Sequence, residues 1–294
     1  MSFSSLKKQS SLGSLTSKLV KEIEKTSTTR GGADERLWKP ELDKTGNGYA
    51  VVRFLPAPDG EDLPWAKVYS HAFQGPGGWY IENSLTTIGG KDPVSEYNRD
   101  LWNSGNDSDK DVVRRQKRKL SYYANIYVVK DPVNPANDGG VFLFKFGKKI
   151  FDKITAAMQP EFEDETPINP FDFWQGANFK LKIRKVDGYW NYDKSEFDAP
   201  APLLDDDDAL EAVWKKEYSL ADFTAQSNFK SYDALEKRLK SVLGQKTAQR
   251  PVLDEELEDE SEGRGAAVQQ VAAATTDDAD ADDALSYFQK LAEN

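Results

Sequence analysis

The chain has 294 residues, no cysteine, one histidine and a formal net charge of -11 at pH 7. Without cysteine it can form neither disulfides nor a thiolate zinc site, and one histidine excludes a site built from several imidazoles. No stretch is long and apolar enough to span a bilayer, and the N-terminus has no apolar signal core, so we expect a soluble, intracellular protein.

The negative charge is concentrated at the C-terminal end of the chain. Residues 252–294 hold 13 acidic and 2 basic residues, whereas acidic and basic residues are equal in number in the rest of the chain. Residues 112–153, by contrast, hold 10 basic and 3 acidic residues. The sequence therefore predicts a basic arm over 1–30, a folded body over 31–250 and an acidic, disordered tail over 251–294.

The predicted arm is rich in Ser, Thr and Lys, and apolar residues recur at helical spacing from Leu12 to Ile23. Part of it is therefore expected to form an amphipathic helix. The arm also contains KKQSS at 7–11, which is similar to KRKLS at 117–121. Chance similarity of composition remains an alternative explanation for this pair.

The body is expected to open with an antiparallel β unit. Residues 49–55, 66–73 and 79–82 have strand-type patterns, and the glycine-rich run 75–78 predicts a turn between the last two. Residues 83–113 show no clear period and are dominated by Gly, Asn, Asp and Pro. An irregular lobe is therefore expected between the strands.

A cationic segment leads into a strand at the centre of the chain. The alternation over 122–129 predicts a strand with Tyr123, Asn125 and Tyr127 on one face and Tyr122 on the other. Cations hold phosphates and flat rings stack on unpaired bases, so this stretch could line a single-strand nucleic-acid groove. A solvated charge run beside an ordinary core strand explains it equally well. The cations before the strand are Arg114, Arg115, Lys117, Arg118 and Lys119.

The same combination of cations and aromatic rings occurs again later in the chain. A strand is predicted over 141–146 and a helix over 147–158. Residues 178–186 then alternate strictly, and Asp187-Gly188 predicts a turn. This repetition favours a nucleic-acid groove over a solvated sheet face. The cations of this strand are Lys180, Lys182 and Arg184, and the aromatic residues after the turn are Tyr189, Trp190 and Tyr192.

No catalytic constellation stands out, so no enzyme is expected. Four aspartates at 205–208 could suggest a two-metal nuclease, but consecutive aspartates at a helix start cannot all converge on one metal pair. They are expected to precede a helix over 209–218, and a second helix is predicted over 228–243. In the tail, a short partner-binding helix could present Leu285, Phe288 and Leu291.

Several segments, in the right order, resemble one family: the single-stranded DNA-binding, helix-destabilising protein of T-even-type bacteriophages. The resemblance covers roughly residues 35–240 and is carried by long stretches rather than one short motif. These stretches are GNGYAVVRFLP (46–56), GGWYIE (77–82), KRKLSYYANIYVVKDP (117–132), FGKKIFDKI (146–154) and GANFKLKIRKVDGYWNYD (176–193).

The resemblance implies an α+β protein. Its core would be a five-stranded oligonucleotide-binding (OB) β-barrel with an irregular inserted lobe, flanking helices and an electropositive cleft. Such proteins coat single strands cooperatively during phage replication, recombination and repair in the cytoplasm of the infected bacterium. The DNA-binding residues expected from the match and the cationic pattern are Trp102, Arg114, Arg115, Lys117, Arg118, Lys119, Tyr122, Tyr123, Phe144, Lys145, Lys148, Lys180, Lys182, Arg184, Tyr189 and Tyr192.

The two ends of the chain would serve protein partners. KKQSS resembles the family's self-association motif, which implies contacts with a neighbouring molecule through Lys7, Lys8, Ser10 and Ser11. The acidic tail would recruit replication and recombination proteins.

One departure concerns metal. Reference members of the family hold a structural zinc through one His and three Cys in the lobe. Here His71 is at the histidine position, whereas the cysteines are absent and Ser84 and Ser95 lie near two of their places. We therefore expect a divergent member with no zinc or other cofactor and a lobe held by packing alone. A single-stranded RNA-binding module, a metal-dependent nuclease and a purely structural phage protein remain the alternative functions.

Overall fold

The computed structural model describes residues 34–162, 164–186 and 189–245. They divide into a short unit that ends at Trp38, with strand β1 (Leu37–Trp38), and a second unit that begins at Lys39. The predicted basic arm and acidic tail, with their self-association and partner-binding residues, lie outside the described residues. None of the helices described here is long and apolar enough to cross a membrane.

The second unit is a mixed α+β fold organised around one long strand, β5 (Lys119–Lys130). One edge of β5 pairs first with β3 through residues 119–123 and then with β2 through residues 126–130. Its other edge pairs with β6. The remaining strands and their bounds are β2 (Gly48–Phe54), β3 (Ala66–Gly75), β4 (Gly78–Asn83), β6 (Val141–Phe146), β7 (Phe179–Val186), β8 (Tyr189–Asn191) and β9 (Glu196–Phe197).

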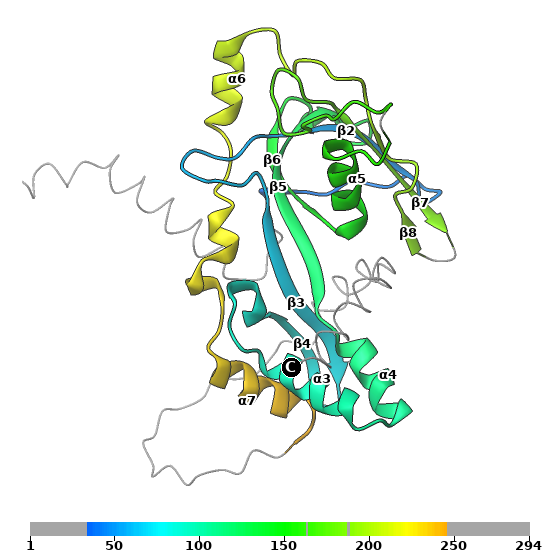
Figure 1. The fold of residues 1–294 in the computed structure, drawn as a ribbon, viewed down its shortest axis with the longest axis vertical. Helices are drawn as coiled ribbons and strands as arrows, with labels where there is room; N and C mark the ends of the chain where they lie inside the picture. The colour runs from blue at the N-terminus through cyan, green and yellow to red at the C-terminus, as the bar shows by residue number, and fades with distance from the viewer. Residues whose placement is uncertain (1–33, 163, 187–188, 246–294) are drawn as a thin grey trace, which may run out of the picture. The chain divides into compact units, whose positions relative to one another are not determined.

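All of these pairings are antiparallel, and the strands run in the order β6-β5-β2-β7-β8. The β3–β4 hairpin extends from the first half of β5, and β9 pairs with β7. Figure 1 shows β3 and β5 side by side. Pairing among the described strands does not close the sheet into a barrel, so the expected five-stranded OB barrel is not confirmed.

Aromatic rings pack around Phe54 of β2 in the core of this unit. Its ring is fully buried, and the centroids of the Phe146, Phe171 and Phe179 rings lie 5.6 to 5.7 Å from it. Offset and tilted ring contacts of this kind add to the stabilisation from area burial alone. The inward residues of β7 are buried as the alternation predicts, because side chains on a strand point to opposite faces in turn.

The segment expected to be irregular is in fact helical. It contains the 3₁₀ helix η1 (Leu85–Ile88) and the helices α3 (Pro93–Asn103) and α4 (Asp107–Gln116). Asp92 caps α3 by accepting hydrogen bonds from the N–H groups of Val94 and Ser95, and Asn106 caps α4. Caps and a proline at the first helical position favour a helix start even without a long apolar stripe. The expectation of an irregular lobe was therefore wrong.

The lobe is completed by α7 (Tyr232–Val242), the last helix of the described residues, whose apolar face packs against β4 and α3 (Figure 1). The β3–β4 turn approaches α7 closely: the N–H of Gly77 donates to the carbonyl oxygen of Val242 at 2.8 Å. A Cβ at Gly77 would lie 2.0 Å from the Ser241 carbonyl oxygen, so this position requires glycine. The buried cluster of the lobe comprises Phe73, Tyr80, Leu85, Val94, Phe229, Leu235, Leu239 and Val242.

Two further helices pack their apolar residues against the rest of this unit. Helix α5 (Lys148–Met158) buries Ile150 and Ile154, as its spacing predicts. Helix α6 (Asp207–Trp214) packs Leu210 and Val213 into a second cluster with Leu55. Asp206 caps α6, and the next two aspartates lie in its first turn, which confirms the helix-terminal interpretation of the acidic run. Short 3₁₀ turns η2 (Pro135–Asn137), η3 (Ala221–Thr224) and η4 (Gln226–Asn228) complete the described chain.

Candidate nucleic-acid interface

The first candidate group surrounds Tyr123 on one face of β5. Lys145 is its cross-strand partner on β6, and the Lys145 Nζ lies 5.8 Å from the centroid of the half-buried Tyr123 ring. The Lys145 side chain is exposed, but the protein atoms around its amino group displace part of the surrounding water, and this desolvation lowers its pKa. The charges of Lys39 and Lys119 lower that pKa further. Mutually repelling cations next to a ring form a favourable site for a phosphate beside a stacked base.

A second group lies on the opposite face of the same strands. Two cations contact the Tyr69 ring: the Arg118 guanidinium carbon lies 4.1 Å and the Lys67 Nζ 5.1 Å from its centroid. The strand register places Tyr69 opposite Leu120, on the face of Tyr122 rather than that of Tyr123. Sequence reasoning missed Tyr69 and Lys67, although their period-two spacing in a predicted strand was a usable signal.

Two aromatic residues expected to face DNA are in the core instead. Tyr122 is 6% exposed and stacks on Phe151 of α5, with ring centroids 4.0 Å apart. Phe144 is 3% exposed, and its ring centroid lies 6.5 Å from that of Phe54. They are buried because the alternation of β5 and β6 turns them towards α5 and the sheet core. The structure therefore presents no open surface at which either ring could stack on a base.

The cationic row on β7 faces outward as predicted, but two of its members are paired. Lys180 forms an ion pair with Asp198, and the Lys182 Nζ lies 2.7 Å from a carboxylate oxygen of Glu196 on β9. The hydrogen bond from Lys182 lowers the pKa of Glu196. Arg184 is exposed further along β7. The row is therefore less positive than the sequence pattern predicts, because a short acidic strand lies beside it.

The remaining predicted residues are distributed over other elements. Arg114 and Arg115 belong to the last turn of α4, where Arg114 pairs with Asp111. Lys148 pairs with Asp152 on α5 at 2.9 Å. Tyr189 on β8 is 43% exposed, Tyr192 is half-buried just beyond that strand, and Lys117 lies between α4 and β5. Trp102 on α3 faces Lys110, whose Nζ lies 5.9 Å from the ring.

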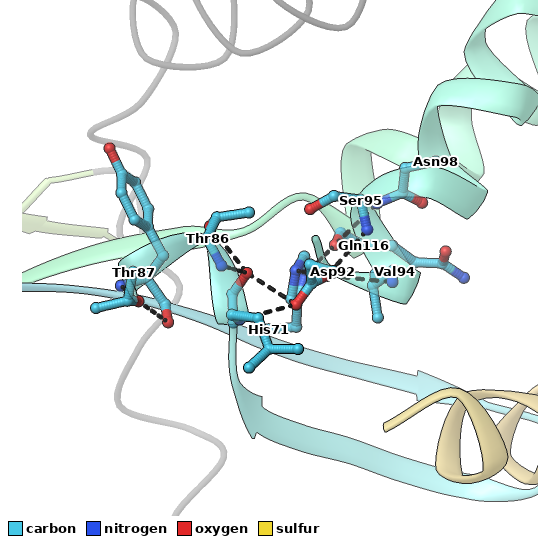
Figure 2. A network of polar contacts seen from close by, with 11 residues as sticks. His71, Thr86, Thr87, Asp92, Val94, Ser95, Asn98 and Gln116 are labelled. Carbon is cyan, nitrogen blue, oxygen red and sulfur yellow. Dashed lines mark hydrogen bonds and ion pairs between the residues drawn. The ribbon is translucent and has the colours of Figure 1, made fainter. Parts of the chain in front are cut away.

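A separate buried polar network holds the lobe together (Figure 2). The Nε2 of His71 lies 3.2 Å from Oδ1 of Asp92, and its Nδ1 lies 2.9 Å from the carbonyl oxygen of Gln116. Oδ2 of Asp92 accepts hydrogen bonds from the Ser84 hydroxyl at 2.9 Å and from the N–H of Leu85 at 3.1 Å. Burial raises the pKa of Asp92, but hydrogen bonds led by that of His71 outweigh it and lower the pKa to about 2.

This network does not fit the zinc site that the resemblance implies. Structural zinc takes four ligands, mainly thiolates and imidazoles, whereas the polar groups gathered here are one imidazole, one carboxylate and serine hydroxyls. Both ring nitrogens of His71 already face protein oxygens. Within the described part of the chain, no three His, Cys, Asp or Glu side chains gather in a way that could hold a metal ion. The lobe is held by hydrogen bonds as well as by apolar packing, so the expectation of packing alone was wrong.

Comparisons with known proteins agree with the resemblance. A family model described as "gp32 DNA binding protein like" matches residues 46–243. The chain is 41% identical over 239 residues to the single-stranded DNA-binding protein of Enterobacteria phage T2, covering 78% of each chain. It is 40% identical over 238 residues to the single-stranded DNA-binding protein of Enterobacteria phage T4, again covering 78% of each. The chain therefore belongs to the gp32-like family of T-even-type single-stranded DNA-binding proteins.

Proposed function

We propose that this protein is a non-enzymatic single-stranded DNA-binding protein that grips phosphates with Lys and Arg and stacks bases on aromatic rings. The proposal rests on the combination of tyrosine rings and cations on both faces of the first half of β5 and its neighbouring strands. On one face the half-buried Tyr123 lies beside Lys145, and on the other face the half-buried Tyr69 lies beside Arg118 and Lys67. Duplex DNA hides its base faces inside the stack, whereas a single strand can offer them to such rings.

In the first proposed step of binding, the cations of the body attract the strand over a long range. Arg118, Lys119 and Lys145 then displace the counterions condensed on the phosphates of the strand, which supplies a salt-dependent part of the affinity. Unstacked bases next contact the tyrosine rings, and this step tolerates different sequences because every base has a flat face. Arg184 on β7 and Tyr189 on β8, which are both exposed, are proposed to extend the path.

We further propose that the protein coats strands cooperatively in phage DNA replication, recombination and repair within the infected bacterium. The arm, through Lys7, Lys8, Ser10 and Ser11, would contact the neighbouring molecule on the strand. The tail, through Leu285, Phe288 and Leu291, would recruit replication and recombination proteins and compete with DNA for the cationic surface. Both roles rest on composition and on the family resemblance.

A titration of the intrinsic Trp and Tyr fluorescence with oligo-dT and oligo-rU tests the proposal. We expect quenching by oligo-dT, because a base stacked on a ring quenches its emission, and weaker binding of oligo-rU. Equal or tighter binding of the RNA would favour the RNA-binding alternative. A labelled strand incubated with the protein and Mg²⁺ should stay intact, and metal-dependent cleavage would favour a nuclease.

A further inference from the structure

A connecting segment, residues 217–229, crosses the Tyr123 face of the sheet, and we call it the strap. Its first part is fixed by Asn125 on β5, whose side chain donates to the carbonyl oxygen of Tyr218 at 2.8 Å and accepts from its N–H at 3.0 Å. The carboxylate of Glu61 accepts hydrogen bonds from the N–H groups of Leu220 and Ala221. The other end is fixed by Phe229, which is buried in the lobe cluster.

Between these anchors the strap places Phe223 directly against Tyr123. The two ring centroids lie 4.1 Å apart and the ring planes differ by 18°. One face of Tyr123 is therefore covered by another ring of this chain. The anchors at both ends of the strap hold its backbone, and with it Phe223, in this position. Little conformational entropy is therefore lost at Phe223 when a ligand binds.

A recess of about 300 Å³ opens beside Tyr123 and is lined by β3, β4, β5, β6 and the end of the strap with the residue that follows it. Phe223 is absent from its lining, whereas Lys145 and Tyr123 both contribute to it. Val68 and Ile81 provide apolar surface, and Ser70, Ser121, Asn83 and Asn228 provide hydrogen-bonding groups. Lys230 also lines the recess but pairs with Glu82 at 2.6 Å, which leaves Lys145 as the cation better placed for a phosphate.

We propose that this recess holds one unpaired nucleotide of the bound strand, and that Phe223 is the positioning residue that keeps the Tyr123 ring directed at it. The inference rests on the proposed function and deepens it. The apolar surface and the ring suit a nucleobase, the amides and hydroxyls suit its polar edge, and Lys145 suits the adjoining phosphate. Phe223 acts through Tyr123: stacking on one face of that ring restricts its rotation.

If Phe223 acts through Tyr123, the losses of affinity caused by substituting the two residues should not be additive. Tyr123→Ala should weaken oligo-dT binding roughly five- to hundredfold, the range expected for losing one stacked base. Phe223→Ala should weaken it about two- to tenfold, because the freed tyrosine ring must be ordered on binding. The double variant should bind no worse than Tyr123→Ala alone, and Phe223→Tyr should bind like the wild type because it keeps a flat ring. Phe162→Ala, at a ring 66% exposed elsewhere, is the matched control.

A photo-crosslink gives a readout that a merely structural role would not change. An oligo-dT carrying one 5-iodo-deoxyuridine should crosslink to Tyr123, with the site located by mass spectrometry. The crosslink should fall in folded Phe223→Ala and persist in Phe223→Tyr and Phe162→Ala. Normal crosslinking at Tyr123 in Phe223→Ala, or losses of affinity that add in the double variant, would overturn the proposal. Failure of the wild type to bind any single strand would instead overturn the proposed function.

Discussion

His71 and Asp92 form a buried pair, with Nε2 and Oδ1 3.2 Å apart and each side chain 1% exposed. The pair links β3 to the start of α3, and hydrogen bonds extend it to the N–H of Leu85 in η1 and to the carbonyl oxygen of Gln116 at the end of α4. The Asp92 carboxylate and its His71 partner therefore fix the relative positions of β3, η1, α3 and α4, which apolar contacts alone would define less precisely. A buried carboxylate with several donors is costly to disturb, because any donor that loses its partner is left unsatisfied.

The first prediction concerns this carboxylate. Asp92→Asn should lower the free energy of unfolding by about 3–5 kcal/mol, because it breaks a buried pair and replaces an acceptor oxygen with a donor. Urea unfolding followed by circular dichroism measures the change. Asp100→Asn is the control, since that side chain is 78% exposed on the same helix. Equal midpoints for the two variants would contradict the role assigned to Asp92.

The same residue predicts a pH dependence at the acid end. The pKa of Asp92 is lowered from 3.8 to about 2 in the folded protein, so the folded state binds its proton less readily than the unfolded state. The stabilisation is therefore complete above about pH 4 and is lost as the pH falls towards 2. The wild type should lose more stability over this interval than Asp92→Asn does. Parallel acid-unfolding curves for the two proteins would argue against it.

The second prediction concerns metal. Because the polar groups around His71 do not fit a zinc site, folding should not depend on zinc. Dialysis against a chelator should leave the Tm unchanged, and metal analysis of the purified protein should find no stoichiometric zinc. A tightly held zinc, or a Tm that falls on chelation, would show that this account of the lobe is wrong.

The third prediction concerns Glu217 in the strap. Burial, and then the charge of Glu61, raise the pKa of Glu217 to about 8, and among the described residues neither of its carboxylate oxygens has a hydrogen-bond partner. A carboxyl whose pKa is raised on folding favours the folded state at low pH, and this advantage is lost as the pH rises from about 4.5 to 8. Glu217→Gln should therefore raise the Tm at pH 8.5 by several degrees and change it little at pH 4.5.

Glu211→Gln provides the control for that measurement, because Glu211 is an exposed glutamate on α6 that pairs with Lys215 at its surface. It should change the Tm little at either pH. If Glu217→Gln and Glu211→Gln respond alike at pH 8.5, the buried carboxyl does not limit the stability of the strap.

The fourth prediction concerns the Tyr69 group. Tyr69→Ala should weaken oligo-dT binding by roughly 1–3 kcal/mol if the ring carries a base, and Tyr69→Phe should change it much less because the flat face remains. Isothermal titration calorimetry with a short oligo-dT measures both. Normal affinity in a Tyr69→Ala protein that melts at a lower temperature would assign the ring to structure alone.

Local alternation predicted much of the fold. Strands β2, β3, β5, β6 and β7 form at the stretches with strand-type patterns, and in β7 Phe179 and Leu181 are buried as the alternation predicts. The lobe helices were missed because α3 and α4 carry few regularly spaced apolar residues, so the informative signals were the caps Asp92 and Asn106. Closure of the sheet was a family expectation rather than a pattern in the residues.

The candidate site was harder to predict, because it depends on which strands become neighbours. The β7 cations are as regular as the pattern indicates, yet Glu196 and Asp198 lie 14 and 18 residues after their partners and only the β7–β9 pairing brings them together. Tyr122 and Tyr123 are adjacent in sequence, and only the position of α5 decides which ring is buried. Phe223 lies in a segment without strand character and gave no sign of its contact with Tyr123.

The salt dependence of single-strand binding shows whether the cations of this surface hold phosphates. Affinity for fluorescently labelled oligo-dT, and for a duplex of equal length, should be measured by anisotropy over a series of NaCl concentrations. We expect tighter binding of the single strand and a linear fall of log affinity with log salt, by about 0.7 per phosphate neutralised. Lys119→Gln with Lys145→Gln should reduce that slope by about 1.4. A flat salt response, or equal affinity for single strand and duplex, would contradict it.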